Sequence, residues 1–287
     1  MQPMKRVLCI HDLSCVGRCS LSVILPVISA MGVQACPLPT ALLSTHTGGL
    51  GDPAVLSAAS FCQDALDHWD RLRIRFDCVY SGYLGDAVSA ELVRCAFEQN
   101  PDACKLVDPV LADHGKLYRA VTPALCQAMI RLCGMADVLC PNVTESAVLL
   151  GLAPEDRPFA PKQLDERLYT LREAFPQTRA VVITGVRLED GTHGNALLEA
   201  AFAPRLFTFA PVNRQYPGTG DLFAAVLAGA LTRGQSVSEG VALAADFVAC
   251  AAAETLRLGQ DPRFGTTFER VLYRLINRKE DESNCQP

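Results

Sequence analysis

The sequence predicts an α/β fold in which a mostly parallel sheet carries helices on both faces. Short apolar, β-rich runs alternate with helical segments through most of the chain, the order that strand–helix–strand units produce. Several of these runs are apolar throughout and stop at polar residues, which is typical of strands buried on both faces. The chain has 287 residues, 49% of them hydrophobic, and can bury a large core. We therefore predict a three-layer α/β/α architecture.

In the first half of the chain, the predicted strands and helices follow one another in order. The predicted strands are Val7–Ile10, Val33–Pro37, Cys78–Ser81 and Lys105–Val107, the helices are Ser20–Met31, Ala54–Trp69, Ala87–Gln99 and Pro123–Cys133, and the polar loops are Ser44–Gly49 and Ala112–Lys116. In the first helix, apolar residues recur three and four positions apart, as on the buried face of an amphipathic helix. Pro53 lies near the start of the second, where proline is favoured.

The second half continues the alternation and then becomes mainly helical. The predicted strands are Asp137–Cys140, Ala180–Thr184 and an antiparallel pair, Asn195–Ala200 with Arg205–Ala210; the predicted helices are Thr144–Leu150, Lys162–Phe175, one that ends near Leu231, Val237–Leu256 and Phe268–Ile276. Because we find no internal repeat and no long linker, we expect residues 1–278 to form a single domain. Residues 279–287 are polar, and we expect them to form a frayed tail.

The composition argues against several classes of protein. A net charge of −5, with no long block of one sign, is unlike a nucleic-acid groove or an anionic-membrane surface. The 13 cysteines include no C-x-x-C pair, so a zinc ribbon is not expected. Val7–Ile10 is too short for a signal peptide, and no apolar run has the length of a membrane span. We expect a cytoplasmic protein with reduced thiols.

Residues 216–225, Tyr-Pro-Gly-Thr-Gly-Asp-Leu-Phe-Ala-Ala, form a glycine-rich turn that leads into an apolar helix. Gly218 and Gly220 allow the backbone to turn its amides inward, and the first turn of a helix leaves N–H groups that attract anions. Asp221 would repel a phosphate, but it suits a base that takes a proton from a hydroxyl attacking a phosphoryl group. An ordinary turn with Asp221 as a helix cap is the alternative, and this motif alone leaves both open.

Further polar residues follow the predicted strands at their carboxyl ends, where open α/β sheets bind ligands. They are Asp12, Tyr83, Asp108, Asn142 and Thr184. Each also has a purely structural explanation: Asp108-Pro109 is a common turn, and Asn142 with Glu145 has the spacing of a capping box. Their shared position is more informative than any one motif. No G-x-x-x-x-G-K-[ST] sequence occurs, so a P-loop enzyme is excluded.

The 216–225 segment resembles the anion-hole signature of the ribokinase-like superfamily, and most closely that of its pyridoxal kinase branch. Other segments that resemble the branch fall in the same order. They are Ile10-His11-Asp12 with Gly17, Ser44–Thr47, Ser81–Tyr83, Asp108–Asp113, Pro141–Glu145 and Val182–Thr184. The similarity runs from about residue 6 to about residue 257. It implies ATP-dependent phosphorylation of the hydroxymethyl group of a B6 vitamer, with Mg²⁺, by a homodimer; a requirement for a monovalent cation is left open.

The resemblance also implies roles for single residues at the phosphoryl-transfer centre. Asp221 would be the general base on the substrate hydroxyl, and Gly218, Thr219 and Gly220 would supply the anion hole. The other implied roles concern the nucleotide and the metal: Asn142 and Glu145 would organise Mg²⁺ and its waters, Asp108 would support that cluster, Thr184 would contact an ATP phosphate, and Asp113 and Tyr118 would lie in a flap over the nucleotide.

The vitamer pocket is where the chain departs from the branch. The resemblance implies that His46, Thr47 and Tyr83 line this pocket, with Tyr83 near the ring. Asp12 occupies the position at which many pyridoxal kinases have a serine facing the pyridine ring. A carboxylate there would favour a protonated ring nitrogen or an aminomethyl group, and hence pyridoxamine or an aminopyrimidine over pyridoxal. The flap segment Ala112–Tyr118 contains no cysteine that could trap an aldehyde.

Three alternatives remain at this point. Hydroxymethylpyrimidine kinases share the fold but usually carry Gly-Thr-Gly-Cys, where this chain has Gly-Thr-Gly-Asp. Sugar and nucleoside kinases usually carry Gly-Ala-Gly-Asp and an amino-terminal Gly-Gly site, and neither is present. A non-catalytic binder of a B6 vitamer or nucleotide would not need the base. The co-occurrence of Asp221, Asn142 and Glu145 favours an enzyme.

Overall fold

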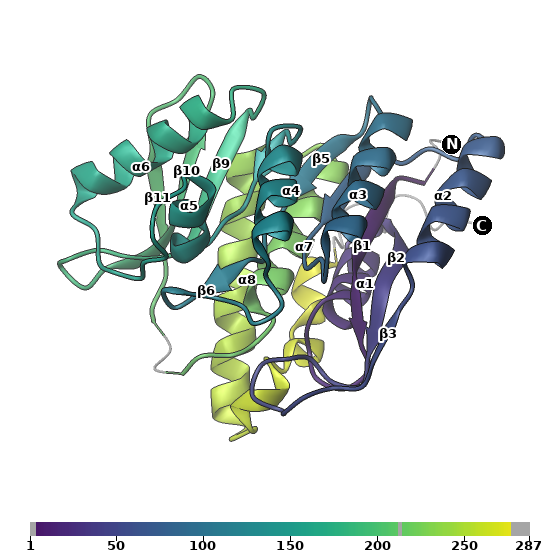
Figure 1. Ribbon diagram of the computed structural model, residues 1–287. Coiled ribbons are helices and arrows are strands. Elements are labelled where there is room, and N and C mark those ends of the chain that lie inside the picture. The colour runs from purple at the N-terminus through teal and green to yellow at the C-terminus, as the bar shows by residue number, and fades with distance from the viewer. Residues whose placement is uncertain (1–3, 212–213, 277–287) are drawn as a thin grey trace, which may run out of the picture.

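The computed structural model describes residues 4–211 and 214–276, which form a nine-stranded sheet between two layers of helices (Figure 1). The strand order is β11-β10-β9-β8-β5-β4-β1-β2-β3. The strands are β1 (Arg6–Ser14), β2 (Gln34–Leu43), β3 (Val55–Ser57), β4 (Cys78–Ser81), β5 (Cys104–Val107), β8 (Val138–Leu139), β9 (Ala180–Arg187), β10 (His193–Glu199) and β11 (Arg205–Thr208). The central strands are parallel. β3 runs antiparallel to β2, and β10 runs antiparallel to both of its neighbours, β9 and β11.

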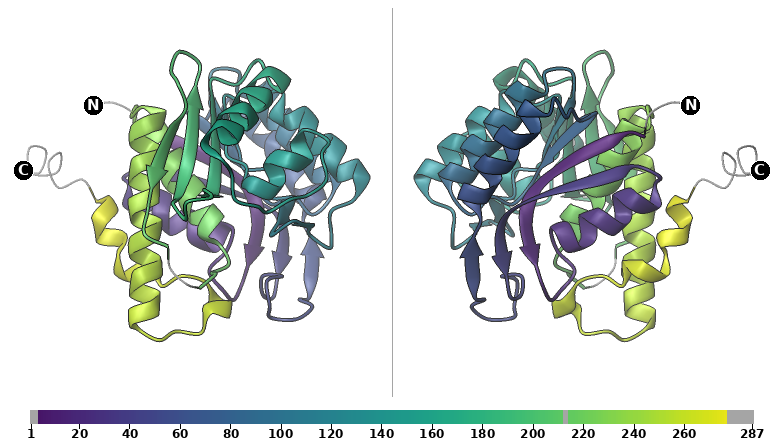
Figure 2. Two further views of the ribbon diagram at one scale, coloured as in Figure 1. Left: turned by 90° about the vertical axis from the view of Figure 1, so that its left-hand side faces the viewer. Right: turned by 90° about the vertical axis from the view of Figure 1, so that its right-hand side faces the viewer.

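The helices cover both faces of the sheet and enclose two apolar cores. They are α1 (Leu21–Ala30), α2 (Ala59–Arg71), α3 (Ala87–Gln99), α4 (Pro123–Cys133), α5 (Val143–Leu149), α6 (Pro161–Ala174), α7 (Thr219–Thr232) and α8 (Val237–Arg257). One core lies between the sheet and α2, α3, α4 and α6, and the other between the sheet and α1, α7 and α8. Figure 2 shows α8 on the opposite side of the sheet from the teal and blue helices. The predicted three-layer, mostly parallel α/β fold is therefore confirmed.

Four predicted elements need correction. β1 continues to Ser14, so His11 and Asp12 lie within the strand rather than after it. The predicted helix over Ala54–Trp69 begins only at Ala59, because Val55–Ser57 pairs with β2 as an edge strand. The loop Ala112–Lys116 contains a small hairpin, β6 (Ala112–Asp113) with β7 (Lys116–Leu117). The segment Phe268–Ile276 forms 3₁₀ turns with bonds from residue i+3 to residue i.

Three further predictions concern the polar tail, membrane-spanning helices and the cysteines. The predicted tail, 279–287, lies outside the described residues. Among the residues that are described, none of the helices is both long and apolar enough to cross a membrane. The cysteines of this part of the chain are free thiols, and half of them are buried.

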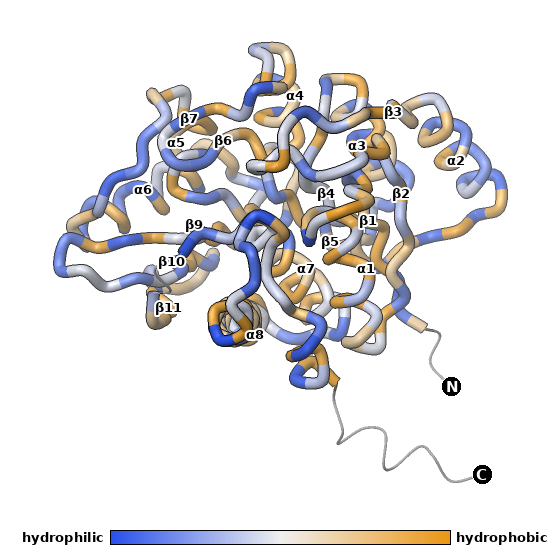
Figure 3. The backbone as a smooth tube through the Cα atoms, turned by 90° about the horizontal axis from the view of Figure 1, so that it is seen from below, coloured by the Kyte–Doolittle hydropathy of each residue, from blue (hydrophilic) through white to orange (hydrophobic). Residues whose placement is uncertain are grey.

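Chain order reverses between β1 and β4: β2 lies on one side of β1, while β4, β5, β8 and β9 follow on the other. Open α/β sheets bind ligands at such a switch point, beyond the carboxyl ends of the strands. Here that edge faces downward in Figure 1, and Figure 3 views the molecule from that side. The fold therefore directs the ends of β1 and β4 towards one shared edge.

Candidate active site

A cavity of about 850 Å³ opens at the carboxyl edge of the sheet. Its size lies within the range of roughly 300–1,000 Å³ that is usual for ligand pockets. All the residues that the sequence nominated line this one cavity: Asp12, His46, Thr47, Tyr83, Asp108, Asp113, Tyr118, Asn142, Glu145, Thr184, Gly218, Thr219, Gly220 and Asp221. The strand ends therefore bring together residues that are more than 200 positions apart in the chain.

The glycine turn before α7 has a backbone that only glycine accommodates well. Gly218 is the residue before the helix, in the left-handed region with φ 80° and ψ 4°. A Cβ atom at Gly218 would lie 2.0 Å from the carbonyl oxygen of Arg18, so the turn also packs directly against the segment before α1. Within the described residues, no side chain caps α7. Its first-turn amides can therefore serve an anion in the cavity.

Asp221 is the third residue of α7 and is partly exposed on the cavity wall. One carboxylate oxygen accepts a hydrogen bond from the backbone N–H of Ser20, at 2.8 Å. Burial raises the pKa of Asp221 to about 7, and the negative charge of Asp12 adds to this rise, while the Ser20 N–H opposes it. A carboxylate with a pKa near neutrality is well matched to proton transfer at physiological pH.

Asp12 is almost completely buried, with 3% of its surface exposed. Its two oxygens accept hydrogen bonds from the hydroxyls of Ser20, at 2.5 Å, and Ser14, at 2.9 Å. No Lys or Arg among the described residues forms an ion pair with it. Burial raises the pKa of Asp12 above its ordinary value, and the hydroxyl bonds oppose that rise. The nearby His46 also lowers the pKa of Asp12, but no Lys or Arg of the described residues neutralises its ionised form.

His46, Thr47 and Tyr83 form the wall beside Asp12. The two ring nitrogens of His46, however, already have hydrogen-bond partners in the protein. Its Nδ1 accepts from the Gly48 N–H at 3.0 Å, and its Nε2 lies 2.7 Å from the Arg263 carbonyl oxygen, which assigns the proton to Nε2. Both ring nitrogens are thus bonded to the protein. His46 contributes packing to the wall, and direct binding of substrate by His46, Thr47 and Tyr83 stays a prediction.

Asn142 and Glu145 form a capping box at the start of α5. Oε2 of Glu145 accepts from the Asn142 N–H at 2.9 Å, and Oε1 accepts from the N–H groups of Leu111, at 2.9 Å, and Ala112, at 3.4 Å. The Asn142 amide donates to the Ala112 carbonyl oxygen at 2.7 Å. The structural explanation of the Asn142–Glu145 spacing is therefore correct, and the same pair also fixes the segment that leads into β6.

Asp108 is a second buried carboxylate, at the end of β5, and is 6% exposed. Burial raises its pKa well above the ordinary range, and repulsion from Glu145 and Asp221 raises it further. Burial likewise raises the pKa of Glu145 to about 7. Clustered carboxylate oxygens of this kind are ligands that suit a hard cation such as Mg²⁺, which usually keeps several of its waters. Among the described residues no group of three or more His, Cys, Asp or Glu side chains could hold a metal, and both Glu145 oxygens accept backbone N–H bonds. A divalent cation near Asp108 and Glu145 would therefore be held largely through its waters.

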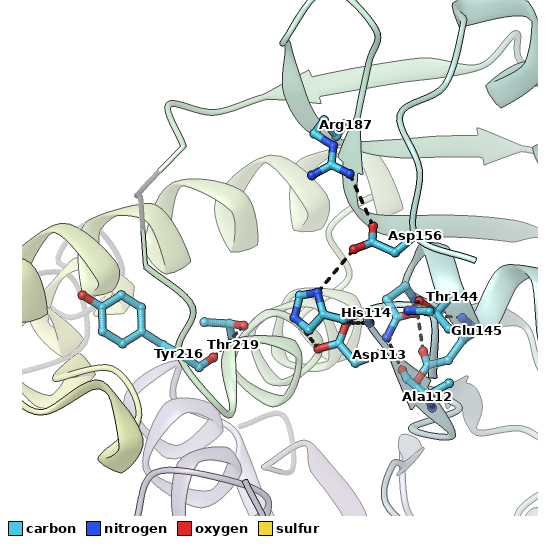
Figure 4. Close-up of polar contacts among 11 residues, drawn as sticks. Ala112, Asp113, His114, Thr144, Glu145, Asp156, Arg187, Tyr216 and Thr219 are labelled. Carbon is cyan, nitrogen blue, oxygen red and sulfur yellow. Dashed lines mark hydrogen bonds and ion pairs between the residues drawn. The ribbon is translucent and has the colours of Figure 1, made fainter. Parts of the chain in front are cut away.

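The β6–β7 hairpin contributes Asp113 and His114 to the cavity wall, and Figure 4 shows the contacts of these two residues. His114 contacts Asp113, at 3.3 Å, and Asp156, at 3.4 Å. Arg187, at the end of β9, lies 3.9 Å from Asp156 and continues this row of polar contacts. Thr184, also on β9, pairs with Asn142 through the backbone in an isolated parallel β-bridge. The His114–Asp156 contact joins the hairpin to the segment before α6, and Tyr118, which follows the hairpin, also lines the cavity.

The sequence did not identify Ser14, Ser20, Asp156 or Arg187 as parts of the cavity wall. Ser20 has φ 53° and ψ −138°, a conformation that favours glycine and costs an ordinary residue about 1–3 kcal/mol. No local sequence pattern marks a serine with that backbone. Its partners Asp12 and Asp221 are distant in sequence, so the contact could be found only from the fold.

Known kinases resemble this chain over most of its length. A model of the phosphomethylpyrimidine kinase family matches residues 25–265. The crystal structure of pyridoxal kinase from Lactobacillus plantarum is 34% identical, with a TM-score of 0.89 over 99% of this chain and 100% of that one. A Bacteroides thetaiotaomicron protein described as a putative phosphomethylpyrimidine kinase, solved in an orthorhombic crystal form with pyridoxal, is 33% identical, with a TM-score of 0.89 over 95% of this chain and 96% of that one.

A third relative is a curated protein named for pyrimidine substrates. The hydroxymethylpyrimidine/phosphomethylpyrimidine kinase of Haemophilus influenzae is 26% identical over 281 residues, which cover 91% of this chain and 95% of that protein. Kinases of two substrate types therefore resemble the chain over most of its length.

Proposed function

The chain belongs to the phosphomethylpyrimidine kinase family and is a kinase of the pyridoxal kinase type, and we propose that it phosphorylates the hydroxymethyl group of a B6 vitamer with ATP. One observation carries the proposal: Asp221 lines the same cavity as the uncapped first turn of α7. A base and an anion-binding turn in one cavity are what transfer of a phosphoryl group to an alcohol requires.

In this proposal, the vitamer hydroxyl lies between Asp221 and the terminal phosphate of ATP. Asp221 takes the hydroxyl proton as the oxygen bonds to phosphorus and the bond to ADP breaks. The amides of Gly218, Thr219 and Gly220 stabilise charge on the transferred phosphoryl oxygens. Thr184 contacts a phosphate from the β9 side, and Asp113 and Tyr118 cover the nucleotide. The raised pKa of Asp221 supports its role as the base.

Asp108 and Glu145 are the residues that would hold Mg²⁺, directly or through water. When bound, the ion would neutralise phosphate charge. Both carboxylates are buried, and within the described residues neither forms an ion pair with Lys or Arg. Asn142 and Glu145 also serve a protein role that is independent of any ion, because together they hold Leu111 and Ala112 in place.

Asp12 gives the proposal a substrate preference. A buried carboxylate that is bonded only to hydroxyls among the described residues would gain most from a cationic group on the substrate. We therefore expect pyridoxamine to have a higher kcat/KM than pyridoxal, and Asp12→Ser to reduce that ratio towards one. Asp12→Asn keeps the size of the side chain but removes its charge and one of its two acceptor oxygens, and it should reduce the ratio as well. An unchanged ratio in both variants would remove Asp12 from substrate selection.

Hydroxymethylpyrimidine is the second candidate substrate, because the matched family and the Haemophilus influenzae relative both point to pyrimidine kinases. It too carries a hydroxymethyl group, and its amino group could face Asp12. The turn Gly218–Asp221 favours the B6 side, since the thiamin-pathway group usually has cysteine in place of Asp221.

The test is ADP release with ATP, Mg²⁺ and a panel of pyridoxal, pyridoxamine, pyridoxine and hydroxymethylpyrimidine. We expect turnover with at least one B6 vitamer and a much lower kcat/KM for the pyrimidine. The reverse order would assign the chain to the second candidate. Absence of turnover with every compound, together with retained binding, would leave a non-catalytic binding protein.

The proposal includes a homodimer, and β3 offers a surface for it. This edge strand exposes Val55 and Leu56, each 63% exposed, and Phe61 of α2 nearby in sequence is 58% exposed. Apolar side chains on an unpaired sheet edge favour association with a second copy. Size-exclusion chromatography with light scattering should give a dimer, and Leu56→Lys should shift it towards the monomer. A monomeric wild type would contradict this part of the proposal.

A further inference from the structure

Ser20 lies between the two carboxylates that the proposed function uses and contacts both of them. Its backbone N–H donates to Asp221 at 2.8 Å, and its hydroxyl donates to Asp12 at 2.5 Å. Both carboxylates line the cavity, and so does Ser20 itself. Among the described residues, the Asp12 side chain has one further hydroxyl partner, Ser14, which forms no such bond to Asp221.

The backbone of Ser20 adopts an unfavourable conformation that makes both contacts possible. With φ 53° and ψ −138°, it occupies a region that residues with a Cβ atom rarely adopt. The residue comes directly before α1, whose first turn is reached by this abrupt change of direction. The φ angle sets the direction of the N–H group relative to the Cα–Cβ bond, so an extended or helical φ would change how the two contacts lie relative to each other. The hydroxyl bond to the buried Asp12 anchors the side chain and so helps to hold the strained backbone.

We propose that Ser20 is a positioning residue that holds the base through its backbone and the substrate-selecting carboxylate through its side chain. The inference rests on the proposed function, because it takes Asp221 as the base and Asp12 as the group that faces the substrate. Its consequence is that the two ends of the substrate, the hydroxyl that reacts and the group that Asp12 recognises, are set at a fixed separation by one residue.

Two substitutions at Ser20 separate its side chain from its backbone. Ser20→Gly and Ser20→Ala both remove the hydroxyl, so both should raise the KM for pyridoxamine about tenfold, as expected for loss of a charge-assisted hydrogen bond. Glycine adopts the positive φ without strain and should keep the N–H on Asp221, so kcat should stay within about threefold. Alanine keeps the strain and loses the anchor, so its backbone should relax and kcat should fall about tenfold or more.

Ser14→Ala is the matched control, because Ser14 also donates to Asp12 and forms no hydrogen bond to Asp221 among the described residues. It should raise the KM for pyridoxamine without the loss of kcat seen in Ser20→Ala. Thermal unfolding of all three variants checks that the assay compares folded proteins. Direct binding of pyridoxamine, measured by calorimetry in the absence of ATP, should weaken in all three.

The result that supports the inference is a fall in kcat in Ser20→Ala alone, with weaker binding in all three variants. Equal kcat values in Ser20→Gly and Ser20→Ala, or unchanged binding in both, would overturn the inference while leaving the kinase proposal intact. A wild-type protein that transfers no phosphate to any vitamer would overturn both.

Discussion

Helices α5 and α7 both carry a carboxylate as their third residue but differ in how their first turns are bonded. The carboxylate is Glu145 in α5 and Asp221 in α7. Burial raises the pKa of both carboxylates to about 7. In α5, however, Asn142 caps the helix and Glu145 accepts three backbone N–H bonds. In α7, Gly218 provides no cap, and Asp221 accepts one N–H from a distant segment.

The difference shows that a buried carboxylate with a raised pKa is not by itself a sign of catalysis. Both oxygens of Glu145 are occupied by the backbone, so its main effect is to hold the strand end and the hairpin. Asp221 keeps one oxygen without a protein partner among the described residues, beside amides that remain uncapped. The position with fewer internal bonds is the one that is available to react with a substrate.

The largest expected effect comes from replacing the two carboxylates in turn. Asp221→Asn should lower kcat by about 10²–10⁴-fold, since it removes the base, while the affinity for ATP changes little. Glu145→Gln should lower kcat less and should also lower the melting temperature, because an amide offers only one acceptor oxygen to three N–H groups. Steady-state kinetics and thermal unfolding measure both. If Glu145→Gln had the larger effect on kcat and no effect on unfolding, the assignment of roles would be reversed.

The pH dependence sharpens the same distinction. Asp221 must be deprotonated to act as a base, and its pKa is raised to about 7. The value of kcat/KM should therefore reach a plateau above pH 7 and fall about tenfold per unit below it, or about 100-fold at pH 5. The profile should be measured with constant ionic strength. In Asp221→Asn, the residual activity should lose this dependence; a variant that kept the same acid limb would assign it to another group.

Gly218→Ala tests the backbone of the α7 turn. The left-handed conformation alone costs about 1–2 kcal/mol with a Cβ atom, and the contact with the Arg18 carbonyl oxygen should add to that. We expect a clear drop in the free energy of unfolding and a loss of kcat. Gly185→Ala is the matched control, because Gly185 also has a positive φ of 65° but no atom lies within 4 Å of the added carbon. Equal destabilisation in the two variants would show that the Arg18 contact is unimportant.

The smallest effect should come from the cap of α5. Asn142→Ala removes one partner of the capping box and the bond to Ala112, and should lower the free energy of unfolding by about 1–2 kcal/mol. Because the hairpin is loosened, the KM for ATP should rise more than kcat falls. Urea unfolding and ATP titration measure the two changes. Asn142→Asp retains an N-cap acceptor but places a carboxylate oxygen against the Ala112 carbonyl oxygen, so it should restore only part of the stability.

Much of the fold could be predicted because the strand and helix patterns agree with their burial. Segments such as Cys78–Ser81, Ala87–Gln99 and Pro123–Cys133 have the bounds that were expected. The errors occurred where distant pairing overrides local pattern. Val55–Ser57 pairs with β2 although helix α2 follows it closely, and the extension of β1 to Ser14 depends on pairing with β2.

The site residues could be nominated from the sequence because strand ends share one edge, and the structure places all of them on one cavity. Their hydrogen-bond partners could not be predicted. The bonds from Ser20 join residues 8 and 201 positions away, and the turn at Ser20 does not use the glycine that its backbone angles favour. The saturation of His46 by Gly48 and Arg263 likewise depends on contacts across the fold. The roles of the nominated residues stay predictions.

The anchoring of the β6–β7 hairpin limits how the cavity can close. Glu145 and Asn142 hold its entry at Leu111 and Ala112, and the Tyr118 N–H is bonded to the Leu111 carbonyl oxygen at 3.0 Å. Both ends of the hairpin are thereby held in place. Its tip is held mainly through the side chains of Thr144 and Asp156. Closure over a nucleotide would therefore involve only a small movement of the hairpin tip relative to its fixed ends. Nucleotide exchange would not require domains to separate.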